Sequence, residues 1–158
     1  MKRQAIFSKD RMYRYALWRL WDMQKPSVCF IGLNPSTASD DEDDPTTRRC
    51  ITFAQQWGFG SLSIANLFAL RSTNPRVLSE VHDPIGQRND EWIHTLSFDA
   101  DITVACWGNQ GTLMGRSAKV LGLVDQLFCL DTTQLGQPKH PLYIRSKTSL
   151  IRFAKRSI

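Results

Sequence analysis

Three polar side chains of this sequence have the chemistry to hold a planar, amide-like ligand, and each stands beside an apolar run. Asn34 follows Val-Cys-Phe-Ile-Gly-Leu, Asn66 follows Leu-Ser-Ile-Ala, and His140 opens His-Pro-Leu-Tyr. An asparagine amide offers both a donor and an acceptor, so it can orient a water molecule or bond to the edge of a base. A histidine on a loop can donate a hydrogen bond to a developing oxyanion.

Each of these residues also has a structural alternative. Asn-Pro sequences are common in turns, where the Asn caps the next segment, and Asn34 precedes a proline. Asn66 could bridge two loops, since a buried amide must find hydrogen-bond partners. A single histidine is more often structural, although Lys139 and Arg145 flank His140 and favour a functional loop.

The elements that must position these residues alternate between apolar runs and helical patterns. Short apolar runs predict buried strands at residues 27–33, 61–67, 102–107 and 126–130. Helical spacing predicts helices over residues 45–57, with Asp44 as N-cap, over 83–97, over 114–124 and over 148–155. Residues 5–20 alternate in part and predict a β-hairpin or edge strand, with a helix over 13–21 as the alternative.

Strand–helix–strand repetition with fully apolar strands predicts an α/β fold. We expect three layers, α/β/α, around a central four-stranded parallel sheet, with the N-terminal hairpin or edge strand added. The carboxyl ends of such strands meet at one edge of the sheet, where ligands bind. Asn34, Asn66 and His140 are expected at this edge. A chain of 158 residues fits one domain, residues 1–158.

The charges are distributed unevenly along the chain. Residues 1–25 contain seven Lys or Arg and two Asp, and residues 139–158 contain six Lys or Arg and no carboxylate. If the two ends lie near each other, they form a basic face suited to phosphate; otherwise these residues only increase solubility. The acidic run at 40–44 is interpreted as a solvated loop, because consecutive carboxylates point in different directions around a loop.

Several classes of protein are excluded by composition. No apolar run approaches the roughly 20 residues that cross a bilayer, and no signal-peptide core follows the N-terminus. The chain is therefore expected in the cytoplasm, with no membrane partner. The four cysteines, 29, 50, 106 and 129, form no C-x-x-C pair. Buried thiols are the better interpretation, and no metal or disulfide is expected.

Taken in order, the motifs resemble those of the uracil-DNA glycosylase superfamily over residues 27–145. The segment GLNP at 32–35 is similar to its first motif, G-x-[DN]-P. The segment IANLFALRSTNP at 64–75 resembles a second-strand motif whose Asn reads the base, T-N-V-V-K-C-R-P-P-x-N-R-x-P. The segment HPLYIR at 140–145 resembles the last motif, H-P-A-Y-L-L-R. The segment GLNPSTA at 32–38 also resembles a sequence found in a family of bacterial and phage proteins.

The resemblance implies a role for each matched residue. Asn34 would position the attacking water and His140 would stabilise the departing base, with no metal and no cofactor. Asn66 would read the base. The remaining base-binding residues would be Gly32, Leu33, Pro35 and Ser36. The residues that contact phosphate or DNA would be Arg71, Lys139, Tyr143 and Arg145.

The chain also departs from the superfamily pattern. Ser36 stands where a glycine follows the first motif, and no aromatic residue in 39–44 is available to stack on a base. An acidic run beside a DNA groove would repel phosphate. The expected function is a hydrolase of an N-glycosidic bond, with DNA or a nucleotide as partner. The alternatives are a non-catalytic nucleotide or modified-base binder and a hydrolase of free nucleotides.

Overall fold

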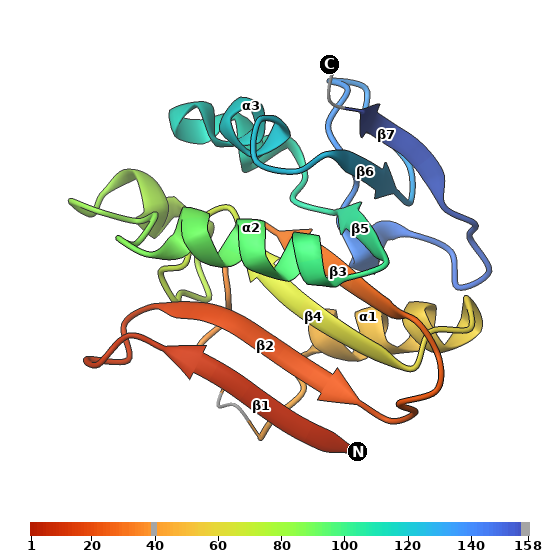
Figure 1. The fold of residues 1–158 in the computed structure, drawn as a ribbon. Helices are drawn as coiled ribbons and strands as arrows, with labels where there is room; N and C mark the ends of the chain where they lie inside the picture. Colours follow the sequence, from red (N-terminus) through yellow and green to blue (C-terminus); the bar gives the residue numbers. More distant parts are fainter. Residues whose placement is uncertain (39–40, 156–158) are drawn as a thin grey trace.

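One mixed sheet runs through the whole molecule in a computed structural model that describes residues 1–38 and 41–155 (Figure 1). Its order is β1-β2-β4-β3-β5-β6-β7. The strands are β1 Lys2–Phe7, β2 Arg14–Leu20, β3 Ser27–Gly32, β4 Ser61–Asn66, β5 Ile102–Ala105, β6 Gln126–Cys129 and β7 Ile151–Lys155. The α/β class is therefore confirmed.

The parallel part of the sheet consists of β4, β3, β5 and β6, which are neighbours at its centre. These strands coincide with the four predicted apolar runs. Antiparallel strands extend this centre on both sides, β2 and β1 beyond β4 and β7 beyond β6. The prediction of a four-stranded parallel sheet is therefore wrong for the sheet as a whole. The four parallel strands are only its centre, and the complete sheet has seven strands and is mixed.

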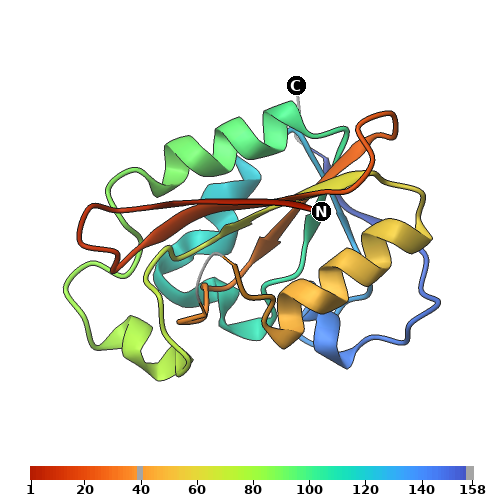
Figure 2. The same ribbon diagram turned by 90° about the horizontal axis from the view of Figure 1, so that it is seen from below.

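Helices cover both faces of the sheet, and each face has its own core (Figure 2). Helix α1, Pro45–Gln56, packs Cys50, Phe53 and Ala54 into one core. Helix α2, Asn89–Asp99, and helix α3, Arg116–Leu121, contribute to the other core. Short 3₁₀ turns complete the connections: η1 Pro75–Ser79, η2 Asn109–Gly115 and η3 Pro141–Tyr143. In the described part of the chain, no helix has the length and apolar character needed to span a bilayer.

The predicted helices are only partly correct. The segment 148–155 contains strand β7 over Ile151–Lys155 instead of a helix, because its backbone pairs antiparallel with β6, with Leu127 opposite Ala154. The predicted helix at 83–97 begins only at Asn89, since Gly86 has φ +91° and interrupts any helix there. The predicted helix at 114–124 is reduced to α3, because Met114 has a positive φ of 54°.

The N-terminal segment forms the hairpin that its alternation predicts, so the helix alternative over 13–21 is wrong. Strand β2 runs antiparallel to β4, and the Arg14 N–H donates to the Ala69 carbonyl at 2.9 Å. The first residues of β2 therefore lie at the same edge as the carboxyl ends of the parallel strands.

The condition for a basic face made from both chain ends, that the two ends lie near each other, is not met by their strands. Strand β1 lies at one edge of the sheet and β7 at the other. Six inter-strand spacings of about 4.8 Å separate them by roughly 29 Å. The basic residues on these two strands therefore do not share one face.

The acidic run is more ordered than a solvated loop. Asp40 lies outside the described residues, and Asp41 and Glu42 are exposed. Asp43, in contrast, accepts from Arg19 at 2.8 Å and pairs with Arg3 at 3.3 Å. Asp44 caps α1 by accepting from the Thr47 N–H. The interpretation as a solvated loop is therefore correct only for Asp41 and Glu42.

Removal of the Asp43 carboxylate is expected to destabilise the protein. The Arg19 side chain is fully buried, so Asp43→Ala takes away the carboxylate paired with a buried charge. We expect a loss of about 2–4 kcal/mol in the free energy of unfolding, measured by urea denaturation. Glu42→Ala, at an exposed neighbour, is the control and should change stability little. Equal stability of both variants would contradict this role of Asp43.

Candidate functional site

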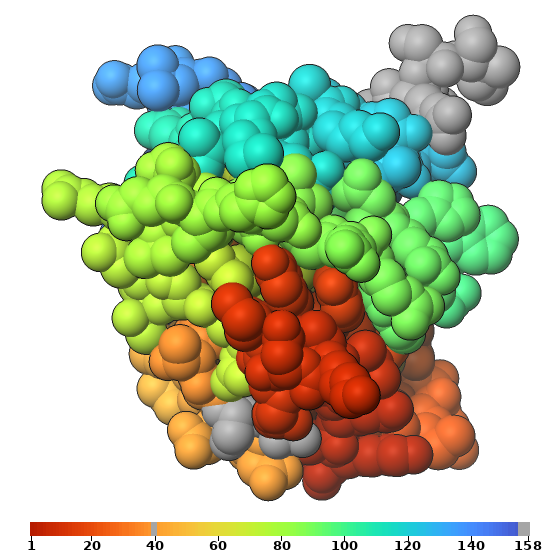
Figure 3. Space-filling model, turned by 90° about the vertical axis from the view of Figure 1, so that its left-hand side faces the viewer, coloured from red at the N-terminus to blue at the C-terminus, as the bar shows by residue number. Residues whose placement is uncertain are grey.

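A cavity of about 560 Å³ opens at the edge where the parallel strands end. Strands β3 and β4 point to the left in Figure 1, and Figure 3 shows that side of the molecule. There the hairpin (red) lies beside the segments coloured yellow-green and green. The lining comes from the ends of β3, β4 and β5, from the start of α1 and from η3. It includes Arg14, Asn34, Asp44, Asn66 and His140.

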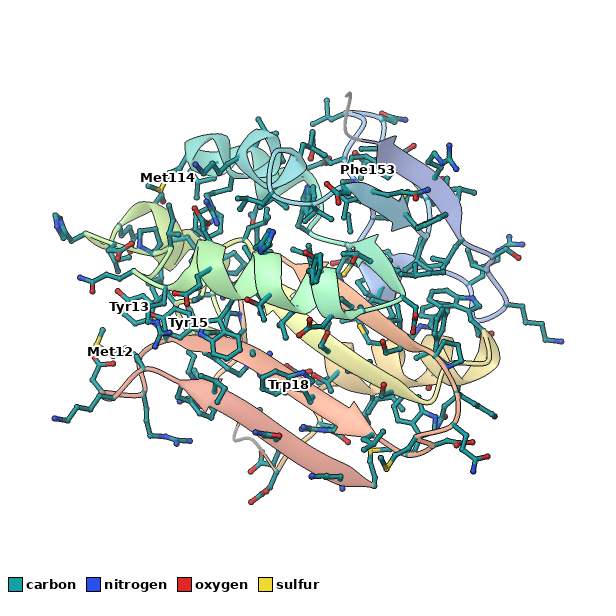
Figure 4. The ribbon with its side chains drawn as sticks, viewed as in Figure 1. Met12, Tyr13, Tyr15, Trp18, Met114 and Phe153 are labelled. Atoms are coloured by element: carbon teal, nitrogen blue, oxygen red, sulfur yellow. The ribbon has the colours of Figure 1, made fainter. Side chains whose placement is uncertain are left out.

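Aromatic and apolar side chains gather at the same end of the molecule. Figure 4 labels Met12, Tyr13 and Tyr15 at the beginning of β2. The rings of Tyr13 and Tyr15 stack at 6.3 Å, and the Tyr13 hydroxyl donates to the Asp83 carbonyl at 2.6 Å. These contacts fasten the hairpin to the segment before α2. Trp18, further along β2, packs edge-on against Trp92 of that helix.

Asn34 is held by its amide nitrogen. Its Nδ2 donates to the Ser72 carbonyl at 2.9 Å and to the Pro35 carbonyl at 3.2 Å. Both hydrogens are therefore used to bind carbonyls, one of them in a distant loop, and Asn34 does not cap the next segment as the turn alternative predicted. The Oδ1 atom receives no hydrogen bond from any residue that the structure describes. Asn34 thus presents an acceptor with a fixed orientation at the cavity.

Asn66 is 4% exposed, and its Nδ2 atom has no hydrogen-bond partner within residues 1–38 and 41–155. Its backbone is held firmly: Asn89 Nδ2 donates to the Asn66 carbonyl at 2.8 Å and to the Leu67 carbonyl at 3.0 Å. Arg116 Nε also donates to the Leu67 carbonyl, at 2.9 Å. A buried donor without a partner costs about 1–3 kcal/mol. A ligand acceptor in the cavity would remove that cost.

His140 has one defined tautomer when neutral. Its Nδ1 accepts a hydrogen bond from the Leu142 N–H at 3.2 Å, so the ring proton is on Nε2. Burial lowers the pKa of the imidazole below its ordinary value of 6.5, and the charge of Asp44 opposes that shift. The turn that carries His140 is attached to α1 by Arg49, which donates to the carbonyls of Pro141 and Ile144. The site therefore contains a neutral N–H donor.

Two charged residues of the cavity were not predicted as site residues. Arg14 is 4% exposed on β2, and Asp44 was predicted only as a helix cap. Burial tends to raise the pKa of Asp44, but hydrogen bonds from Ser36 Oγ and Thr47, with the Arg14 charge, lower it overall. Burial lowers the pKa of Arg14 to about 10, against the charge of Asp44, so Arg14 stays protonated at neutral pH. No signal in the sequence separates Arg14 from Arg19, the other arginine of β2.

The remaining predicted residues divide into two groups. Gly32, Leu33, Pro35 and Ser36 line the cavity, and Tyr143 lies at its rim with 82% of its surface exposed. Arg71, Lys139 and Arg145 are not among the lining residues. Arg71 donates to the carbonyls of Thr37 and Ala38, and Lys139 pairs with Asp131 at 3.4 Å. The structure thus gives Arg71 and Lys139 intramolecular partners.

Aromatic side chains line the cavity at positions that the sequence comparison did not identify. Phe30, on β3, and Trp107, directly after β5, are both buried and belong to the lining. Trp107 is oriented by a hydrogen bond from Nε1 to Gln137 Oε1 at 2.9 Å. Gly111 packs against the indole so closely that a Cβ there would lie 2.0 Å from Trp107 Cδ1. A planar ligand therefore has apolar walls available.

The four cysteines are free and buried, which confirms their interpretation as buried thiols. Cys50 and Cys106 line the cavity. A hydrogen bond with Cys106, followed by burial, raises the pKa of the Cys50 thiol well above its ordinary value. The Cys50 thiol is therefore a weak metal ligand and a weak nucleophile. Within residues 1–38 and 41–155, no group of three or more His, Cys, Asp or Glu is arranged to hold a metal ion.

Gly32 is expected to be required for the position of the Asn66 side chain. A Cβ at residue 32 would lie 2.9 Å from Asn66 Oδ1, so Gly32→Ala should displace the amide. We expect a loss of about 1–3 kcal/mol of stability, measured by thermal unfolding, and a shift of the Asn66 amide resonances in NMR spectra. Gly122→Ala is the control, because Gly122 has an ordinary φ of −84° and lies outside the cavity. Unchanged Asn66 resonances in Gly32→Ala would refute the steric argument.

No curated protein and no solved structure matches the chain. A family model described as "Protein of unknown function (DUF1643)" matches residues 14–142, well over half of the chain. The matched region begins at Arg14, ends two residues after His140, and contains every lining residue named above except Tyr143. The chain belongs to the DUF1643 family.

Proposed function

We propose that the cavity binds a nucleobase and that the protein hydrolyses the N-glycosidic bond that joins this base to a sugar. One observation supports the proposal: three polar residues with complementary chemistry line a single cavity. They are His140, whose neutral ring carries its proton on Nε2; Asn34, whose Oδ1 is an acceptor; and Asn66, whose Nδ2 has no hydrogen-bond partner among the described residues. The parallel centre of the sheet and the order of the motifs support a fold like that of uracil-DNA glycosylases.

Base recognition would depend on Asn66. Its amide can donate to a carbonyl oxygen of the base and accept from a neighbouring ring N–H, which is the pattern of a cyclic amide. Phe30 and Trp107 provide apolar surface for the ring faces. The backbone contacts from Asn89 and Arg116 keep the end of β4 in place, so the amide is oriented before the ligand arrives.

Hydrolysis would use the other two polar residues. Asn34 Oδ1 accepts a hydrogen bond from a water molecule and directs its oxygen to the anomeric carbon of the sugar. A bond forms between that oxygen and the carbon, and the bond between carbon and base nitrogen breaks, with its electron pair leaving on the base. His140 Nε2–H donates to the base anion as the charge develops. The proton released by the water finally neutralises the base.

Asp44 would contribute through its negative charge. Transition states at a glycosidic carbon resemble an oxocarbenium cation, which a nearby carboxylate stabilises. Asp44 stays ionised because the hydrogen bonds from Ser36 at 2.6 Å and from Thr47 at 2.7 Å hold its pKa low. It is thus a fixed anion in the cavity, and the water would be placed by Asn34.

The first test is a survey of substrates. Purified protein is incubated with single- and double-stranded DNA containing uracil, deaminated purines or oxidised bases, and with the corresponding free nucleotides. Released base is detected by chromatography. We expect release from at least one substrate, with a loss of about 10²-fold or more in Asn34→Ala and His140→Ala. His82→Ala is the control, because His82 is exposed and does not line the cavity. Absence of release from every substrate would exclude the hydrolase.

Asp44→Asn separates the charge of Asp44 from its role as a helix cap. Asparagine is as good an N-cap as aspartate, so the hydrogen bond from the Thr47 N–H should remain and the melting temperature should change little. We expect the rate of base release to fall about 10- to 100-fold, because the stabilising anion is lost. Asp44→Ala, which also removes the cap, should lower the melting temperature as well. An unchanged rate in Asp44→Asn would show that the charge is not used.

The pH dependence of stability and activity should follow His140. Its folded-state pKa is lowered, so the unfolded chain binds a proton more readily. Stability from this group is present above the unfolded value, near 6.5, and is lost as pH falls through the lower folded-state pKa. Activity should decline over the same range, since protonation of Nδ1 removes the acceptor of the Leu142 N–H. Thermal melts and NMR titration of the imidazole between about pH 5 and pH 8 measure both effects; a folded-state pKa above 6.5 would contradict the expectation.

Binding without catalysis is the second candidate function. It is favoured by the state of Asp44, since both of its carboxylate oxygens already accept hydrogen bonds and are poorly placed to take a proton from water. In the substrate survey, thermal stabilisation by a nucleotide without release of base would support this function. Release of base by the same nucleotide would support the hydrolase.

A further inference from the structure

Arg14 differs from the other buried arginines of this protein. Arg14, Arg19 and Arg116 are all buried, with 4% or less of their surface exposed. Arg19 pairs with Asp43 at 2.8 Å, and Arg116 pairs with Asp90 at 2.6 Å. Among the described residues, Arg14 has no carboxylate within 4.0 Å, and its Nε atom has no hydrogen-bond partner. Arg14 is also the buried arginine that lines the cavity.

Asp44, the carboxylate whose charge acts on Arg14, does not form a hydrogen bond with this guanidinium in the described structure. The charge of Asp44 acts on Arg14 electrostatically. The two carboxylate oxygens of Asp44, however, accept hydrogen bonds from Ser36 Oγ and from the Thr47 N–H. A buried cation without a hydrogen-bonded partner costs several kcal/mol of stability. Five N–H donors in a planar fork are suited to two oxygens of one anionic group. The Arg14 guanidinium is therefore suited to a ligand that carries an anionic group and binds in the cavity.

The surface around the cavity does not suit a long polyanion. Strands β1 and β7, which carry part of the basic residues of the two chain ends, lie at opposite edges of the sheet. Near the rim, Arg71 donates to backbone carbonyls and Lys139 pairs with Asp131. Asp41 and Glu42 are exposed just before α1, where they would repel the phosphates of a duplex. A favourable positive charge, that of Arg14, is thus inside the cavity.

The size of the cavity permits a ligand larger than a base. Pockets of about 300–1,000 Å³ commonly hold ligands of drug size, and this cavity has about 560 Å³. A base, its sugar and one phosphate fit in that range. Arg14 and Asn66 come from neighbouring strands, β2 and β4, so a single small ligand can reach both.

We propose that Arg14 is the anion receptor of this cavity and that the substrate is a free nucleotide whose phosphate monoester binds to the Arg14 guanidinium. The assignment of the base to Asn66 rests on the proposed function above. The contact between Arg14 and phosphate does not, so it can be tested with ligands that contain no base.

The experiment compares ligands with and without the phosphate. Binding of inorganic phosphate, deoxyribose 5-phosphate, a nucleoside monophosphate, the matching nucleoside and the free base is measured by thermal shift and calorimetry. The proteins are the wild type, Arg14→Met, Arg14→Lys and the control Arg88→Met, which changes an exposed arginine outside the cavity. The nucleotide that gives the largest shift in a preliminary survey is used. A 5′-phosphorylated trinucleotide distinguishes a free nucleotide from the end of a nucleic acid.

The wild type is expected to bind the nucleoside monophosphate roughly 30- to 1,000-fold more tightly than the nucleoside, as for other buried charge pairs. Arg14→Met should bind both ligands with the affinity of the nucleoside, and Arg14→Lys should retain part of the preference. Without ligand, Arg14→Met should melt at or above the wild-type temperature, because an unpaired buried charge is removed. Arg88→Met should behave as wild type.

Several results would overturn the proposal. The first such result is equal affinity of the wild-type protein for the nucleotide and the nucleoside. This comparison uses only the wild type, so it remains valid even if Arg14→Met does not fold. Weaker binding of the free base in Arg14→Met would assign Arg14 to the base instead. Binding of the trinucleotide as tightly as the mononucleotide would assign the site to nucleic-acid ends. Cleavage of the nucleoside and the nucleotide at equal rates would refute the role of Arg14 as anion receptor but not the hydrolase activity. Binding of phosphate without release of any base would refute the hydrolase activity but not the role of Arg14.

Discussion

The close approach of the Asn66 amide to the backbone of Gly32 is the constraint on which the cavity depends. Strands β3 and β4 end in register, with Gly32 opposite Asn66, and the Leu67 N–H donates to the Gly32 carbonyl at 2.9 Å. A side chain at residue 32 would occupy the space of the amide oxygen. The amide can therefore turn toward the cavity only because glycine ends β3. The next residues, Leu33 and Asn34, begin the loop at the same point, so the position of Asn34 depends on the same register.

Buried polar residues of helices α2 and α3 stabilise this arrangement. Asn89 is fully buried and donates to two consecutive carbonyls at the end of β4, and Arg116 donates to the second of them. These carbonyls follow the last parallel ladder position, where the sheet no longer satisfies them. Helices α2 and α3 thus contribute more than apolar contacts. They supply the hydrogen bonds that keep the strand end, and with it Asn66, in one conformation.

The sequence predicted the parts of this structure that depend on local pattern. The four central strands were found because strands buried on both faces are almost entirely apolar, as in Ser27–Gly32. Strand β7 was mistaken for a helix because an edge strand alternates only in part, and its pairing with β6 is a tertiary effect. Asn34, Asn66 and His140 were predicted to meet because they follow strand ends, and all three line the cavity. Arg14 was not predicted, because its position depends on which strand β2 pairs with and in which direction.

The direction of β2 explains why the hairpin matters to the site. In a purely parallel sheet, only the carboxyl ends of strands reach the ligand edge, so a residue that begins a strand lies at the opposite side. Strand β2 is antiparallel to β4, and its first residue, Arg14, therefore lies beside the ends of the parallel strands. The same strand carries Arg19, whose charge is satisfied by Asp43. The protein thus pairs one buried arginine of β2 with a carboxylate, whereas the other, at the cavity, has none within 4.0 Å among the residues that the structure describes. An added antiparallel strand would in this way bring to the cavity a charge that the parallel strand ends do not themselves supply.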